Sequence, residues 1–125
     1  MTWAAVMFAA ALGGAARYLL AEWLDRRSRS AWPWGTWCVN LLGSVLIGLL
    51  AASMVQGEAM ASARWLVVAG AGLGSFTTVS AFTLQALSLW RSHPVRTVVY
   101  VAATVVLCPL AAGAGLMLGQ RVLGS

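Results

Sequence analysis

The chain has 125 residues, of which 61% are hydrophobic and only 9% are charged. Soluble domains carry about 25% charged residues, so this composition excludes an ordinary soluble protein and indicates a lipid bilayer as the solvent. The net charge of +5 comes entirely from arginine. The arginines flank apolar runs, as membrane-interface anchors and topology signals do, and we prefer this interpretation to nucleic-acid binding.

Four apolar runs are long enough to cross a bilayer, which takes about 20 mostly apolar residues. Helical spans are expected at about 2–23, 34–55, 65–90 and 97–120. The connections are too short to hold a soluble domain, so residues 1–125 are predicted to form a single four-helix transmembrane domain of the all-α class. Arg17 interrupts the first run and no basic segment precedes it, so we do not expect a cleaved signal peptide.

Charged residues near the first span bear on topology and on a vestibule. Arg17 is embedded in the span, where it either lines an aqueous vestibule that attracts anions or extends to the interface as an anchor; we expect a mixture of both. With four spans the termini share one side of the membrane. The loops of the opposite side hold Arg26, Arg27, Arg29, Arg91 and Arg96. The terminal side holds only Arg64 and Arg121, so the bias favours both termini outside.

The second run carries a polar stripe. Thr36, Asn40, Gly43 and Ser44 fall on one face of a helix. One interpretation is a seam of small residues for helix packing, with Asn40 as an interhelical hydrogen bonder. The other is a polar track that lines a path through the membrane. The stripe by itself leaves both open.

The third run combines helix-weakening glycines with a group of hydroxyl side chains. The glycines are Gly70, Gly72 and Gly74, and the hydroxyls belong to Thr77, Thr78, Ser80 and Thr83. Irregular backbone at membrane depth is tolerated only where protein or a cavity satisfies it, so we predict a broken helix here. Freed carbonyls would suit a hard cation, whereas freed N–H groups and hydroxyls would suit an anion.

The fourth run repeats the polar stripe. Tyr100, Thr104 and Cys108 are spaced by four residues and share a helical face. One such stripe is usually structural, but two stripes on two helices favour a lined path. Gly115 and Gly119 form a GxxxG pair, which is typical of close helix packing.

Acidic side chains are missing from the centres of the spans. Glu22, Asp25 and Glu58 lie at span ends or in loops, and His93 lies in a loop. A small proton-coupled exporter of organic cations needs a buried carboxylate, so it is the weaker alternative. A non-transporting scaffold subunit is a third. The chain lacks a Ser/His/Asp set and a metal-binding cluster, so we expect no enzyme. Donors without acids favour anion passage, and four helices are few enough that an oligomer is expected.

Three motifs carry a family resemblance: GGAARY at Gly13–Tyr18, GTWCVN at Gly35–Asn40 and GSFTTVSAF at Gly74–Phe82. Together they resemble the Fluc (CrcB) family of fluoride channels, in the right order and through all four spans. The resemblance implies a passive, fluoride-selective channel of the bacterial inner membrane that exports fluoride from the cytoplasm and lowers its toxicity. It also implies an antiparallel, dual-topology dimer with two pores.

The resemblance assigns roles to individual residues. It implies a structural sodium ion at the dimer interface, held by the backbone carbonyls of Gly74 and Thr77. It places the fluoride pore at Asn40, Thr36, Thr78, Ser80, Val79, Phe82, Tyr100, Thr104 and Cys108. Fluoride is small and strongly hydrated, and hydroxyls, an amide and positively polarised ring edges can replace its water.

The third motif departs from the family pattern. The family sequence TTFSTF reads TTVSAF at residues 77–82, so Val79 replaces a phenylalanine and Ala81 a threonine, while Phe82 matches. The resemblance gives both phenylalanines a fluoride-coordinating ring edge, which valine lacks; Phe76 is a candidate replacement. One interpretation is a homodimer with an altered pore. The other is one subunit, conducting or not, of a heterodimer, which the arginine bias supports slightly. We prefer the homodimer because symmetric assembly is commoner.

Overall fold

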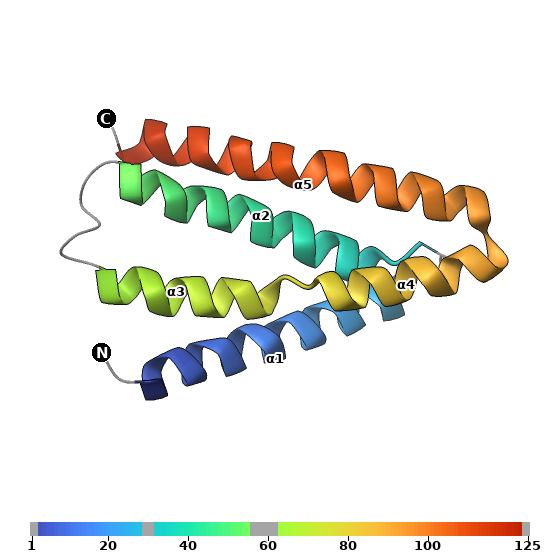
Figure 1. Ribbon diagram of the computed structural model, residues 1–125, viewed down its shortest axis with the longest axis horizontal. Coiled ribbons are helices and arrows are strands. Elements are labelled where there is room, and N and C mark those ends of the chain that lie inside the picture. Colours follow the sequence, from blue (N-terminus) through green and yellow to red (C-terminus); the bar gives the residue numbers. More distant parts are fainter. Residues whose placement is uncertain (1–2, 29–31, 56–62, 124–125) are drawn as a thin grey trace.

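The computed structural model describes residues 3–28, 32–55 and 63–123, and every regular element in them is a helix (Figure 1). The helices are α1 (Trp3–Arg27), α2 (Trp34–Val55), α3 (Ala63–Phe76), α4 (Val79–Ser92) and α5 (Pro94–Leu123). The expected all-α architecture is confirmed. Arg29 and Glu58, which the sequence places in loops, lie outside the described residues.

Three of the helices suit a bilayer. Those long and apolar enough to cross a membrane are Trp3–Arg27, Trp34–Ser53 and Pro94–Val122. Their apolar side chains point outward as much as inward: α1 buries none of its residues, and Trp3, Met7 and Phe8 are exposed. A helix that is apolar on its outer face fits lipid better than water.

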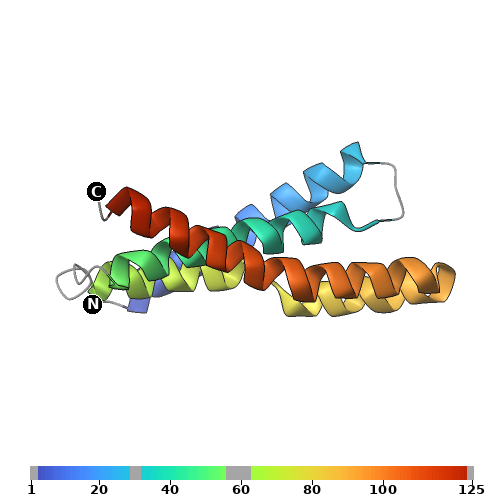
Figure 2. The same ribbon diagram turned by 90° about the horizontal axis from the view of Figure 1, so that it is seen from above.

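The helices form an elongated bundle. The start of α1 and the end of α5 lie at the same end of it (Figure 1). α2 packs most extensively against α5, and α1 packs most extensively against α3. At the far end, the last turns of α1 and the first turns of α2 diverge from α4 and from the start of α5 (Figure 2). Two of the cavities described below lie between the diverging helices.

α1 continues past its predicted span because charged side chains stabilise its last turns. Glu22 and Arg26 form an ion pair one turn apart, with Nη2 and Oε1 separated by 2.6 Å. The guanidinium carbon of Arg27 lies 4.5 Å from the centre of the Trp23 ring. Both arginines also face the negative end of the helix dipole. The chain therefore stays helical after its apolar run has ended.

The third apolar run is divided between α3 and α4 by Thr77 and Thr78. Thr78 has extended backbone, with φ −151° and ψ 126°, and its hydroxyl accepts a hydrogen bond from the Ala81 amide as the N-cap of α4. The break lies at the hydroxyl end of the segment in which an interruption was expected, and Gly70, Gly72 and Gly74 lie inside α3. The interruption thus occurs where a threonine can cap a new helix, and of the three glycines Gly72 lies against α1.

Glycine permits the close approach of α2 and α5. A Cβ added to Gly115 would overlap the carbonyl oxygen of Val45, and one added to Gly48 would overlap that of Ala112. Gly119 is also buried against α2. Seams of this kind bring helix backbones into contact in membranes. The packing role expected for Gly115 and Gly119 is confirmed.

Replacing Gly115 by alanine is expected to destabilise the protein, because the new methyl group meets backbone that cannot move away easily. Overpacking of this kind lowers the free energy of unfolding by about 1–3 kcal/mol. The free energy of unfolding is measured by reversible unfolding in detergent micelles, followed by circular dichroism.

Gly113→Ala is the matched control on the same helix, since no described atom lies within 4 Å of its added Cβ. This control should keep or slightly raise the stability, because alanine has the higher helix propensity. An equal loss in both variants would contradict the glycine seam.

Candidate functional site

A cavity of about 420 Å³ lies at the junction of α3 and α4 and is bordered by α2 and α5. We call it the junction cavity. It is lined by Asn40, Ser44, Ile47, Gly74, Thr77, Thr78, Val79, Phe82, Thr104 and Cys108. The structure therefore brings together most of the residues that the sequence assigns to a pore, although they come from three helices and the α3–α4 junction.

Asn40 holds the junction in place. Its Nδ2 donates a hydrogen bond to the Thr78 carbonyl oxygen at 3.0 Å, and its Oδ1 accepts one from the Thr78 amide at 2.8 Å. One side chain thereby satisfies both backbone groups of a residue that lies outside the helices. Asn40 is an interhelical hydrogen bonder and lines the cavity too, so the two interpretations of its stripe are not exclusive.

The same contacts release two backbone carbonyls. In an uninterrupted helix the Thr78 amide would bond to the Gly74 carbonyl, and the Ala81 amide to that of Thr77. Here the Thr78 amide donates to Asn40, and the Ala81 amide donates to the Thr78 hydroxyl at 3.1 Å. The carbonyl oxygens of Gly74 and Thr77 have lost their helical donors. Oxygens of this kind are suitable ligands for a hard monovalent cation.

α5 supplies a polar wall. Thr104 and Cys108 line the junction cavity. The Thr104 hydroxyl is buried and forms no hydrogen bond to any described residue, which is uncommon for a buried polar atom. It is left as a donor for a ligand. Tyr100, one turn earlier, is fully buried and does not line the cavity, but its ring centroid lies 5.3 Å from that of Phe82.

Two other predicted residues face outward at the cavity's edge. The Val79 side chain is 77% exposed, and the exposed Ser80 hydroxyl lies 3.2 Å from the Thr78 hydroxyl. Phe76 does not take the place of the missing ring. It lines a separate apolar cavity of about 630 Å³ between α1, α2 and α3. It belongs to the end of α3, so the junction separates it from the α4 face that carries Val79 and Phe82.

A polar cavity of about 400 Å³ lies between α1, α2 and α4 and is called the vestibule cavity here. It is lined by Arg17, Tyr18, Ala21, Glu22, Asp25, Arg26, Thr36, Ala81 and Gln85. Arg17 and Thr36 therefore line the same cavity. Thr36, which the sequence assigned to the pore together with Asn40, does not line the junction cavity. Arg26 pairs with Glu22 in this lining, and Arg17 supplies the other positive charge beside Asp25.

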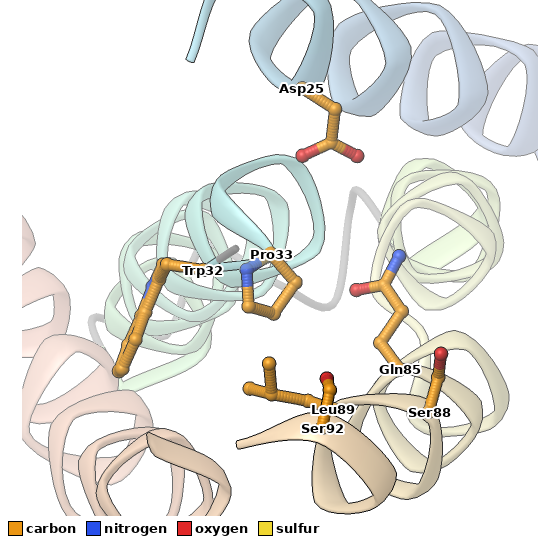
Figure 3. Close-up of a pocket in the computed structure, with 7 residues that line it drawn as sticks. All are labelled: Asp25, Trp32, Pro33, Gln85, Ser88, Leu89 and Ser92. Carbon is orange, nitrogen blue, oxygen red and sulfur yellow. The ribbon is translucent and has the colours of Figure 1, made fainter. Parts of the chain in front are cut away.

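A neighbouring cavity of about 300 Å³ shares two residues with the vestibule cavity, Asp25 and Gln85. Its close-up shows Asp25 extending from α1 and Gln85 from α4 toward the space beside Pro33 (Figure 3). The Gln85 Oε1 atom is buried and bonds to no described residue. The two cavities therefore adjoin along a line of polar groups at the divergent end of the bundle.

Asp25 has a structural role that the sequence analysis missed. It lies within α1, and its Oδ1 accepts a hydrogen bond from the Gly35 amide at 2.8 Å. The first amides of a helix have no partner inside it, so Asp25 caps α2 from another helix and fixes the start of α2 beside Thr36. Local capping signals concern the residue next to the helix, and this acid lies ten residues away.

Comparison with known proteins covers most of the chain. A family model described as "CrcB-like protein, Camphor Resistance (CrcB)" matches residues 4–116. The "Fluoride-specific ion channel FluC" of Caulobacter sp. (strain K31) is 40% identical over 114 residues, which are 90% of this chain and 89% of that protein. Proteins of the same name from Rhizobium johnstonii and Hahella chejuensis are 42% identical over 113 residues and 37% identical over 120 residues. The first match covers 89% of this chain and 90% of the Rhizobium protein. The second covers 94% of this chain and 94% of the Hahella protein. The chain belongs to the CrcB family.

Proposed function

We propose that the protein is a passive, fluoride-selective channel that exports fluoride from the cytoplasm across the bacterial inner membrane and so lowers its toxicity. The junction cavity is the observation that carries this function. The Asn40 amide and the hydroxyls of Thr78 and Thr104 meet there beside the Phe82 ring, and no acidic residue is among its described lining residues. The relatives named fluoride-specific ion channels support the same function.

The donors in the junction cavity suit a small, strongly hydrated anion. Asn40 Nδ2 carries two hydrogens, and its bond to Thr78 uses one of them. The Thr104 hydroxyl is free to turn toward an ion. The edge of the Phe82 ring is positively polarised. These groups replace the water of fluoride, while Arg17 in the vestibule cavity raises the local anion concentration. An inside-negative potential drives the anion outward.

α3 and α4 together are proposed to form one membrane crossing, which makes residues 1–125 a four-span domain. Each helix has 14 residues, a length of about 21 Å, and this is short of the roughly 30 Å hydrocarbon core. Joined through Thr77 and Thr78 they are long enough. The start of α1 and the end of α5 then share a side, as Figure 1 shows for the bundle.

An antiparallel dimer is part of the proposal. Gly74, Val79 and Ser80 are exposed in the single chain, yet irregular backbone inside a bilayer must be covered by protein. Gly70 and Gly74 lie four residues apart on α3, and no described atom lies within 4 Å of a Cβ added to either. This open seam fits a close crossing of the α3 helix of a second copy. A heterodimer with one non-conducting subunit is the second candidate for the assembly, because the pore of this chain has valine at position 79 where the family has an aromatic ring.

A structural sodium ion at the dimer interface completes the proposal. The carbonyl oxygens released at Gly74 and Thr77 would hold it, two from each copy, and neutral oxygens suit a monovalent cation. The mass of the purified protein in detergent checks the dimer. Fluoride flux after sodium is replaced by a large organic cation checks the ion.

Liposomes containing the purified protein are expected to release fluoride when a membrane potential is applied and to retain chloride. Ion-selective electrodes measure both anions. Absence of fluoride flux, alone and with a paralogous partner, would exclude the channel. Proton-coupled uptake of an organic cation would instead establish the exporter.

Asn40→Ala is expected to reduce fluoride flux by about tenfold or more. It removes both bonds to Thr78 and leaves the part-buried Thr78 amide unpaired, which costs about 1–3 kcal/mol. Flux per folded protein in liposomes is the measurement. Ser53→Ala is the matched control on α2, since the Ser53 hydroxyl bonds only within its own helix, to the Leu50 carbonyl at 2.6 Å. Equal flux in the two variants would leave Asn40 with a packing role only.

Val79→Phe is expected to raise fluoride flux or fluoride affinity by about twofold to tenfold, the value of one added aromatic contact. The position is open enough for a ring, and it borders the junction cavity. Val95→Phe on α5 is the matched control, because Val95 is 78% exposed and lies outside that cavity. Wild-type behaviour of Val79→Phe would show that the pore tolerates the missing ring.

A further inference from the structure

A continuous series of aromatic rings leads from the segment before α2 to the junction cavity. Phe82 lines the cavity, and its ring centroid lies 5.3 Å from that of Tyr100. Tyr100 meets Trp32 edge to face, with centroids 5.3 Å apart and planes at 86°. Trp32 in turn contacts Trp37 at 5.9 Å and Trp34 at 6.0 Å. Aromatic pairs attract at these separations.

Ring contacts orient Tyr100. The residue is fully buried, and its hydroxyl forms no hydrogen bond to any described residue. The hydroxyl therefore does not set the rotation of the ring within this chain, whereas Phe82 and Trp32 both touch it. Interiors are close-packed, so a smaller side chain at position 32 would leave space into which the Tyr100 ring can move.

Trp32 is itself well fixed. Its carbonyl oxygen accepts a hydrogen bond from the Trp34 amide at 2.9 Å, and the following Pro33 restricts its backbone to extended conformations. Trp34 and Trp37 hold its ring from the first turn of α2. The series is thus anchored to the helix that also carries Asn40.

Phe82 depends on this series for its orientation. Tyr100 is the aromatic ring that contacts it in the described part of the chain. Val79, three residues earlier on α4, offers only a short branched side chain that is mostly exposed. Orientation matters because the edge of a phenyl ring is positively polarised and its face is negative. A rotated Phe82 would present a repelling face to an anion.

We propose that Trp32 is a positioning residue for anion selectivity: it holds Tyr100, and Tyr100 holds the edge of Phe82 toward the junction cavity. The inference rests on the proposed fluoride channel. Trp32 lines the neighbouring cavity beside Asp25 and Pro33 but not the junction cavity, and its contact with Tyr100 is its route to Phe82.

Trp32→Leu is expected to lower the ratio of fluoride to chloride flux in liposomes by about threefold to tenfold, the value of one aromatic contact. Trp32→Phe keeps a ring and should restore the ratio to within about twofold of wild type. Trp32→Met is a second non-aromatic variant, used where Trp32→Leu does not fold. Trp90→Leu is the control: it removes an exposed tryptophan of α4 that lines none of the three polar cavities and should keep the wild-type ratio.

A double variant separates positioning from general destabilisation. Adding Trp32→Leu to Phe82→Leu should cause no further loss of selectivity, because no ring edge remains to be oriented; an additive loss would overturn the inference. If the wild type conducts fluoride and Trp32→Leu keeps the wild-type ratio of fluoride to chloride flux, the role of Trp32 is overturned and the proposed channel stands. A wild type that carries no fluoride would remove the proposed function and this inference with it.

Discussion

The paired hydrogen bonds between Asn40 and Thr78 are the contact on which the rest of the structure depends. Thr78 has extended backbone between two helices, and its amide and carbonyl would be costly to bury unpaired. A carboxamide offers one donor and one acceptor side by side, so Asn40 satisfies both groups at once. With those groups bonded, the Thr78 hydroxyl is free to cap α4, and the direction of α4 carries Phe82 to the junction cavity.

Glycine contacts decide what Asn40 faces. Gly48 and Gly115 bring α2 against α5 closely enough that Thr104 and Cys108 share a cavity with Asn40. On the other side of the molecule, a Cβ on Gly13 would overlap the carbonyl oxygen of Gly72, which sets α1 against α3. Apolar side chains gain little by leaving lipid for one another, so close backbone packing and interhelical hydrogen bonds position these helices.

Polar groups are distributed between two regions with different chemistry. The vestibule cavity holds the charged side chains, among them Arg17 and Asp25, at the divergent end of the bundle. The junction cavity holds neutral donors and the released carbonyls. One oxygen of Asp25 is bonded to the Gly35 amide, so this carboxylate holds the start of α2 in place. Val79 is exposed, and no other described helix packs against Gly70 and Gly74. The side of the junction that a second copy would cover therefore lies on the surface of the single chain.

The helical class, the apolar runs and the polar stripes could be read from the sequence, because helical periodicity and composition are local properties, and three motifs were enough to indicate the family. The sequence located α2 correctly and named most residues of the junction cavity. It predicted an interruption of the third run within the segment of glycines and hydroxyls but not its bounds, joined Thr36 to Asn40 and left Asp25 in a loop. Only the tertiary structure decided these points. A helix ends where another element can satisfy its backbone, and that partner, Asn40 for Thr78 or Asp25 for Gly35, is distant in sequence and leaves no local pattern.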